Sequence, residues 1–231
     1  MNHKFIVFIS ANLRNTSFYI ILFITISSFE IVYPQKNFEK NFYGGIFFIS
    51  SYIASSEFQE LKQKTDDINL VDTIYLKALK FFDNDESEAL LCLTFACLPY
   101  NKIRIRFLFN SILTIPLPSS PLTIFNKKLK NLPKKIFFDS YNDEFGDKDK
   151  LSHFFGNAFL GYNSSIFNLS KFIGIFVEII EQELFIDGSY DNRDILTNYL
   201  GGLFGKTLKN KKEILPSEVL KVYQLLFLRL F

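Results

Sequence analysis

The sequence predicts a mainly α-helical fold, a helical bundle with a small β element near residues 103–115. Apolar residues recur at helical spacing in several segments, which is the pattern of helices with one buried face. Short polar residues that favour helix starts precede these segments. In one short segment, apolar residues alternate with arginines, which predicts a strand. The alternating residues are Ile103, Arg104, Ile105, Arg106 and Phe107.

Composition places the chain among globular proteins of ordinary size. Its 231 residues fit one domain plus a leader, and we assign residues 31–231 to a single mainly helical domain. Hydrophobic residues make up 48% and charged residues 22%, which excludes a disordered chain. The net charge of +2 does not indicate nucleic acid as a partner. Cys92 and Cys97 lie in an apolar run at a spacing that does not stack them on a helix, so we predict two buried thiols.

The N-terminus has the pattern of a leader segment. Lys4 and Arg14 precede an uncharged run, residues 15–29, which Glu30 ends. The run is shorter than the roughly 20 apolar residues of a spanning helix and matches the core of a signal peptide. A cleaved secretory signal, an uncleaved membrane anchor and a buried first helix all agree with it. We expect residues 1–30 to be a signal peptide or membrane anchor, which places the protein in the cell envelope, exported or membrane-anchored.

Capping residues mark the first helices of the domain. Asp66-Asp67 opens a helix whose apolar stripe covers residues 70–79. Asn84-Asp85 starts another, because a short polar side chain accepts hydrogen bonds from the free N–H groups, and this helix ends near Pro99. The signals at residues 46–53 are mixed, so a short strand and a helix turn remain alternatives there.

Two further helices begin at prolines. Ser120-Pro121 indicates a cap followed by the first helical position of a short basic helix that ends at Leu132. Pro216-Ser217 starts a C-terminal amphipathic helix, which is either a packing element or a face for a protein partner. Lysines gather in two groups, which form either solvated faces or contacts for a membrane or anionic lipid surface. The groups are Lys127, Lys128, Lys130, Lys134 and Lys135, and Lys206, Lys209, Lys211 and Lys212.

A polar stripe follows the charged turn at Asp147. Asp149, His153 and Asn157 lie four residues apart, so they share one face of a helix over residues 151–160. Apolar side chains cover the rest of that helix. The stripe must therefore face water or polar partners inside the protein.

A second polar block contains Glu178 and Gln182, again four residues apart and inside an apolar run. A carboxylate is costly to bury alone, so Glu178 needs a partner. His153 is the natural one. The two blocks together predict an imidazole that meets an acid between packed helices.

A third block lines one face of a helix that follows a polar loop. Asp194 and Asn198 share this face with small residues. Glycine costs about 1 kcal/mol relative to alanine inside a helix, so several of them predict that another backbone approaches closely. Arg193 is expected to hold a carboxylate. The glycines are Gly201, Gly202 and Gly205.

The three blocks in this order resemble the VanZ-like superfamily of small bacterial envelope proteins. The resemblance covers about a quarter of the chain, within residues 147–205, and implies a helical bundle associated with the membrane or envelope. It implies no established activity. Members carry several spanning helices, whereas Lys171 and short apolar runs depart from that pattern, so residues 166–180 are interpreted as buried helices. The matching residues are Asp149, Lys150, His153, Phe154, Glu178, Gln182, Asp194, Asn198, Gly201 and Gly205.

Three functions remain alternatives, and the sequence leaves open whether the protein is an enzyme. In the first, it is an envelope-associated structural or interaction protein with a buried polar network. In the second, it is a hydrolase in which His153, Glu178 and Asp194 bind a divalent metal, or in which His153 is a general base. In the third, a Phe-rich interior binds lipid or another amphiphile. The network residues around His153 are Asp149, Asn157, Gln182, Arg193 and Asn198.

Overall fold

The mainly helical fold with a small β element is confirmed by eight helices and one pair of strands in the described part of the chain. The predictions for the leader, and those for Glu178 and Gln182, concern positions outside it. The computed structural model describes residues 38–106, 112–163, 192–210 and 213–227.

Polar caps start the first four described helices. In each, the side chain of the cap accepts a hydrogen bond from a backbone N–H of the first turn. Residues 46–53 are therefore helical, and the caps expected before the next helices are confirmed. The helices and their caps are α2 (Phe42–Ile53, Asn41), α3 (Ser56–Lys64, Ser55), α4 (Asp67–Phe81, Asp66) and α5 (Glu86–Ala96, Asp85).

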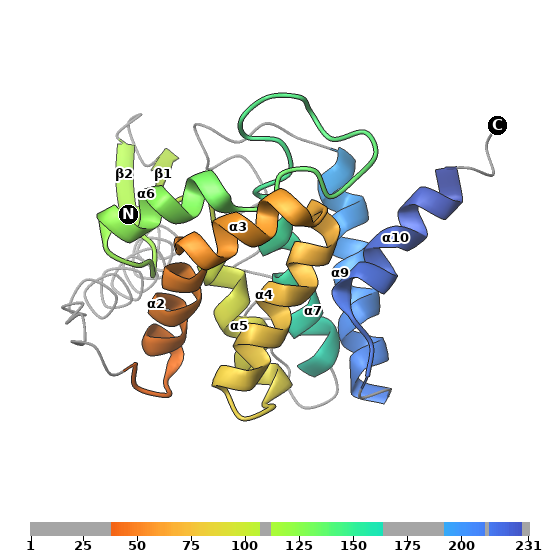
Figure 1. The fold of residues 1–231 in the computed structure, drawn as a ribbon, viewed down its shortest axis with the longest axis horizontal. Coiled ribbons are helices and arrows are strands. Elements are labelled where there is room, and N and C mark those ends of the chain that lie inside the picture. The colour runs from red at the N-terminus through yellow and green to blue at the C-terminus, as the bar shows by residue number, and fades with distance from the viewer. Residues whose placement is uncertain (1–37, 107–111, 164–191, 211–212, 228–231) are drawn as a thin grey trace, which may run out of the picture. The chain divides into compact units, whose positions relative to one another are not determined.

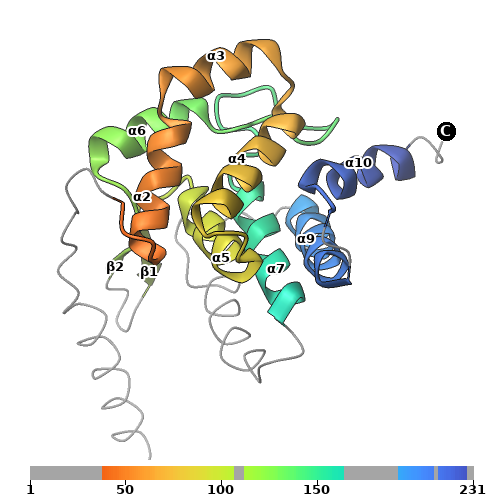
Figure 2. The same cartoon turned by 60° about the horizontal axis from the view of Figure 1, so that its bottom comes forward.

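The core lies between α5 and the helices that surround it. In Figure 1, α4 and α5 lie side by side, and α7 (Lys150–Asn163) packs on α5. Figure 2 shows α7, α9 (Asn192–Asn210) and α10 (Pro216–Phe227) next to one another. The ring of Phe204 lies 5.4 Å from that of Phe154 and 5.5 Å from that of Tyr75, centroid to centroid. These contacts join α4, α7 and α9 in one core.

Two strands form the expected β element. β1 (Lys102–Arg106) and β2 (Ile112–Pro116) pair antiparallel, with Ile103 opposite Ile115 and Arg104 opposite Thr114. The alternation of isoleucine and arginine in the sequence therefore corresponds to the two faces of this hairpin.

The structure corrects two predictions at α6 (Leu122–Asn131). Ser120 does not cap this helix: Pro121 occupies the N-cap position, and no side chain caps the first turn. Lys128 does not belong to a surface patch of lysines, because its side chain is buried and its ammonium group donates to the carbonyl oxygens of Ala96 and Leu98, at 2.8 and 2.9 Å. A positive group at the end of α5 satisfies carbonyls that have no partner within the helix.

The two thiols are free and buried, as predicted for Cys92 and Cys97. Both lie in or next to α5, in the main apolar cluster. Among the described residues, no helix combines the length and the apolar character that crossing a bilayer requires.

Candidate functional site

The backbones of α7 and α9 approach each other closely because glycines leave room. A Cβ added at Gly201 would lie less than 3.0 Å from the carbonyl oxygen of Phe154, and one at Gly205 equally close to that of Ala158. A Cβ added at Gly202 would meet nothing within 4 Å. The predicted close approach is thus confirmed for two of the three glycines, which share a face with Asp194 and Asn198.

A lysine joins the acids of the two helices. Lys150 begins α7 and its side chain is 3% exposed. Its ammonium group lies 3.0 Å from Oδ2 of Asp149 and 2.6 Å from Oδ1 of Asp194. Both carboxylates are only partly buried, 20% and 24% exposed, so solvent weakens these pairs, while the lysine itself depends on them for compensation of its charge.

His153 reaches α9 with both ring nitrogens. Its Nδ1 lies 3.2 Å from Oδ1 of Asn198, and its Nε2 lies 3.8 Å from Oδ1 of Asp194. The same Asn198 oxygen accepts a hydrogen bond of 2.7 Å from Nδ2 of Asn157. An oxygen that serves as acceptor requires Nδ1 of His153 to be the donor. In the neutral ring, the lone pair of Nε2 therefore points to the side of Asp194.

Three of these side chains offer donor atoms for a cation. The atoms of Asp149, His153 and Asp194 lie within 4.8 Å of one another, and all three residues are half-buried. Oδ1 of Asp149 is buried and has no hydrogen-bond partner among the described residues. One imidazole and two carboxylates are ligands that divalent transition metals accept. Lys150 competes for the same two carboxylates.

Arg193 holds a carboxylate, but that of Asp147, outside the His153 cluster. Its Nη1 donates to Oδ1 of Asp147 at 2.8 Å, and its guanidinium group lies 4.1 Å from the ring centroid of Tyr141. The side chain of Asp147 is fully buried. Its Oδ2 accepts hydrogen bonds from the backbone of Ile136 and Phe137, at 3.1 Å each, and from the hydroxyl of Ser140. This second cluster fixes the loop before α7 to the start of α9.

The structure brings together most of the predicted site residues that it describes. Asp149, His153, Asn157, Asp194 and Asn198 meet between α7 and α9, and within each helix they share the face that the helical spacing predicted. Sequence reasoning did not assign roles to Lys150 or Asp147. The alternating charges of residues 147–150 were the available signal, since a lysine at the start of a mostly apolar helix needs acids nearby if it is buried.

The charges of the cluster are only partly balanced. Two carboxylates face one ammonium group, and the imidazole is held by an amide. Such an arrangement can fix the register of two helices, and it can also present Nε2 of His153 to a cation or to a proton.

Comparisons of the chain with protein-family models, with curated proteins and with solved structures gave no match.

Proposed function

We propose that this chain is an envelope-associated structural or interaction protein in which the His153 cluster locks α9 onto α7. The observation that carries the proposal is the buried ammonium group of Lys150 between Asp149 and Asp194. It offsets one of the two negative charges that would otherwise attract a metal. The resemblance to the VanZ-like superfamily supports the envelope assignment and remains a part of the proposal.

The lock acts together with the glycine contacts. Small residues bring the two backbones close, but apolar contacts alone permit the helices to slide by a turn. Hydrogen bonds and ion pairs between named positions permit only one register. We infer that the fixed helix pair presents its outer surface to a partner in the envelope.

Replacement of Lys150 by methionine tests the lock. We expect Lys150→Met to lower the free energy of unfolding by about 2 kcal/mol or more, because two carboxylates then face each other without a cation. Lys150→Arg should retain most of the stability. The wild-type melting temperature should not change when a chelator is added. A stable Lys150→Met variant, or a protein that a chelator destabilises, would contradict the proposal.

Envelope association is tested separately in cells. The full chain with a C-terminal tag should be found in the membrane or exported fraction, and not with a cytoplasmic marker. Recovery of the full chain only with the cytoplasmic marker would refute the envelope part of the proposal and leave the structural lock unaffected.

A second candidate function is cation-dependent or general-base chemistry at His153. The specific observation that favours it is the unpartnered, buried Oδ1 of Asp149 near the free lone pair of His153 Nε2. Here Asp149 and Asp194, with Glu178 as the further predicted acid, would hold a divalent metal, or one of them would orient His153 as base. The metal would supply Lewis acidity for hydrolysis.

Titration with Zn²⁺ and Mn²⁺ distinguishes the two candidates. If the second holds, calorimetry gives one site for each chain, and His153→Ala abolishes it. Asn198→Ala is the matched variant, since it removes the support of the imidazole and leaves the three donor residues in place. Absence of binding in the wild type, together with loss of stability in His153→Ala, favours the lock.

A further inference from the structure

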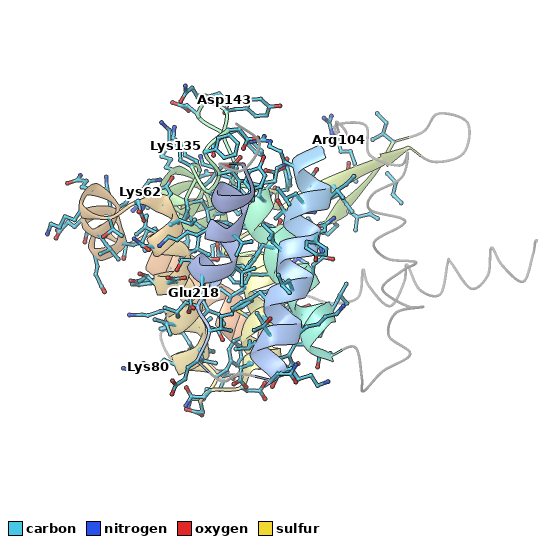
Figure 3. All side chains as sticks on the ribbon, turned by 90° about the vertical axis from the view of Figure 1, so that its right-hand side faces the viewer. Lys62, Lys80, Arg104, Lys135, Asp143 and Glu218 are labelled. Atoms are coloured by element: carbon cyan, nitrogen blue, oxygen red, sulfur yellow. The ribbon has the colours of Figure 1, made fainter. Side chains whose placement is uncertain are left out.

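Helix α9 carries a row of large apolar side chains that nothing in the described part of the chain covers. Ile195, Tyr199 and Leu203 are 56%, 69% and 38% exposed. They lie four residues apart, so they follow one another along one face of the helix. Figure 3 views the molecule from the side on which α9 and α10 lie. We call these three residues the α9 row.

The opposite faces of α9 explain why the row points outwards. Gly201 and Gly205 lie against α7, and Leu200, Phe204 and Leu208 are buried in the core. The helix cannot turn to bury the row without the loss of the His153 cluster. Three apolar side chains in one line are more than the scattered exposed residues of an ordinary surface. The row is therefore a candidate contact surface.

Charge on the same face indicates the kind of partner. Lys206 and Lys209 are exposed in the last turns of α9, and Lys209 also has an interaction within the chain. The sequence from Ile195 to Asn210 contains no acidic residue. Tyr199, the most exposed of the three, has an apolar ring and a polar hydroxyl, which suits the boundary between lipid and water. Lysines near an anionic lipid surface strengthen binding.

We propose that the α9 row and the adjacent lysines dock onto an anionic lipid surface, with α9 parallel to the bilayer. This inference rests on the proposed envelope association and names the partner of that association. The row enters the boundary between headgroups and acyl chains, as in interfacial helices, and the lysines contact the headgroups. The His153 cluster keeps the row facing outwards.

A local probe in the full chain tests the docking without interference from the leader. Tyr199→Cys labelled with the environment-sensitive dye NBD should show a blue-shifted emission on vesicles of phosphatidylglycerol and phosphatidylcholine. It should show little change on pure phosphatidylcholine, and salt should reduce the shift. The matched control is Leu76→Cys on α4, because Leu76 is also an exposed apolar residue, at 48%. The native thiols should not react, since both are buried and burial raises the pKa of Cys97 to about 12.

A gain-of-binding variant provides a second measurement. The open space beside Gly202 admits a larger side chain next to the row. Gly202→Leu should strengthen binding to anionic vesicles several-fold, and Tyr199→Glu should weaken it about tenfold, while Leu76→Glu leaves it unchanged. Circular dichroism checks that each variant is folded.

Three outcomes would overturn the inference. A shift at position 76 equal to that at 199 indicates unspecific adsorption. A concentration-dependent shift at 199 without lipid indicates that a second copy of the chain covers the row. A chain that sediments with vesicles or membranes without any shift at 199 refutes the α9 docking but leaves the proposed envelope association intact. That association fails only if the cell fractionation fails.

Discussion

Gly201 of α9 faces the carbonyl oxygen of Phe154 in α7, in a space that has no room for a Cβ atom. At the next residue, Gly202, an added Cβ atom would meet nothing within 4 Å. Two adjacent glycines of one helix therefore have opposite roles. The missing Cβ of Gly201 permits the close approach of the two helices, whereas a Cβ at Gly202 would point into open space.

Replacement of these two glycines by alanine should have opposite effects. Gly201→Ala should lower the free energy of unfolding by about 1–3 kcal/mol, because the new methyl group forces α7 and α9 apart. Gly202→Ala should raise it by up to about 1 kcal/mol, because alanine favours the helix. Urea unfolding of both variants measures the difference. Equal effects of the two variants would show that α7 and α9 are not in close contact in solution.

Asp147→Asn should destabilise the protein strongly. The fully buried carboxylate pairs with Arg193, so the variant removes the negative charge that Asp147 places beside a nearly buried guanidinium group. Loss of one partner of a buried pair costs about 3–5 kcal/mol. The matched control is Asp83→Asn, which removes the carboxylate of an exposed pair with Lys40 and should cost less than about 1 kcal/mol. Denaturant midpoints that fall equally in both variants would contradict the role of Asp147.

Neutral His153 should carry its proton on Nδ1. The acceptor role of Asn198 Oδ1 requires this tautomer. Long-range ¹H–¹⁵N NMR spectra distinguish the two tautomers, and the chain has only two histidines, so a His3→Gln variant assigns the signals. Asn198→Leu should change the tautomer ratio of His153. A predominant Nε2–H form in the wild type would refute the described hydrogen bonds.

Stability should rise with pH between about 8 and 10.5 because of Lys128. Burial lowers the pKa of Lys128 to about 8 from 10.5, although Cys97 acts in the opposite direction. In that window the unfolded chain binds more protons than the folded chain, so deprotonation favours folding. The gain in free energy of unfolding is about 1 kcal/mol from pH 7 to pH 9.

The Lys128 contribution is isolated as the difference between wild type and Lys128→Met at each pH. Other lysines and tyrosines titrate in both proteins and cancel. Lys80→Met serves as the control for the removal of an exposed lysine. A flat difference for Lys128→Met would show that the ammonium group is hydrated.

Local patterns in the sequence were sufficient to predict several secondary-structure elements. They also predicted which residues of α7 and of α9 share the polar face of each helix. The caps at Asp66 and Asp85 and the alternation at Ile103 depend on neighbouring residues, which is why they were predictable. The stripe of His153 with Asn157, and that of Asp194 with Asn198, follow from the helical repeat alone.

Pairings between distant segments were not predictable in the same way. Arg193 was expected to hold a carboxylate, but helical spacing cannot reveal that Asp147 is its partner, 46 residues earlier. Lys128 was assigned to a surface patch because its neighbours in sequence are lysines. In the structure it instead donates to the carbonyl oxygens of Ala96, at the end of α5, and of Leu98, just after it. A lysine in a basic run gives no local signal that it is buried.

Asp147 is translated before its cation. A nascent chain that has emerged only as far as α7 holds this carboxylate among neutral donors from residues 136, 137 and 140, while Arg193 is still to be synthesised. The apolar side of α7 that Phe204 covers in the finished protein is exposed at the same stage. Products that end before α9 therefore have two defects, a buried carboxylate without its arginine and an exposed apolar surface on α7. Chaperones and proteases should recognise such products as incomplete.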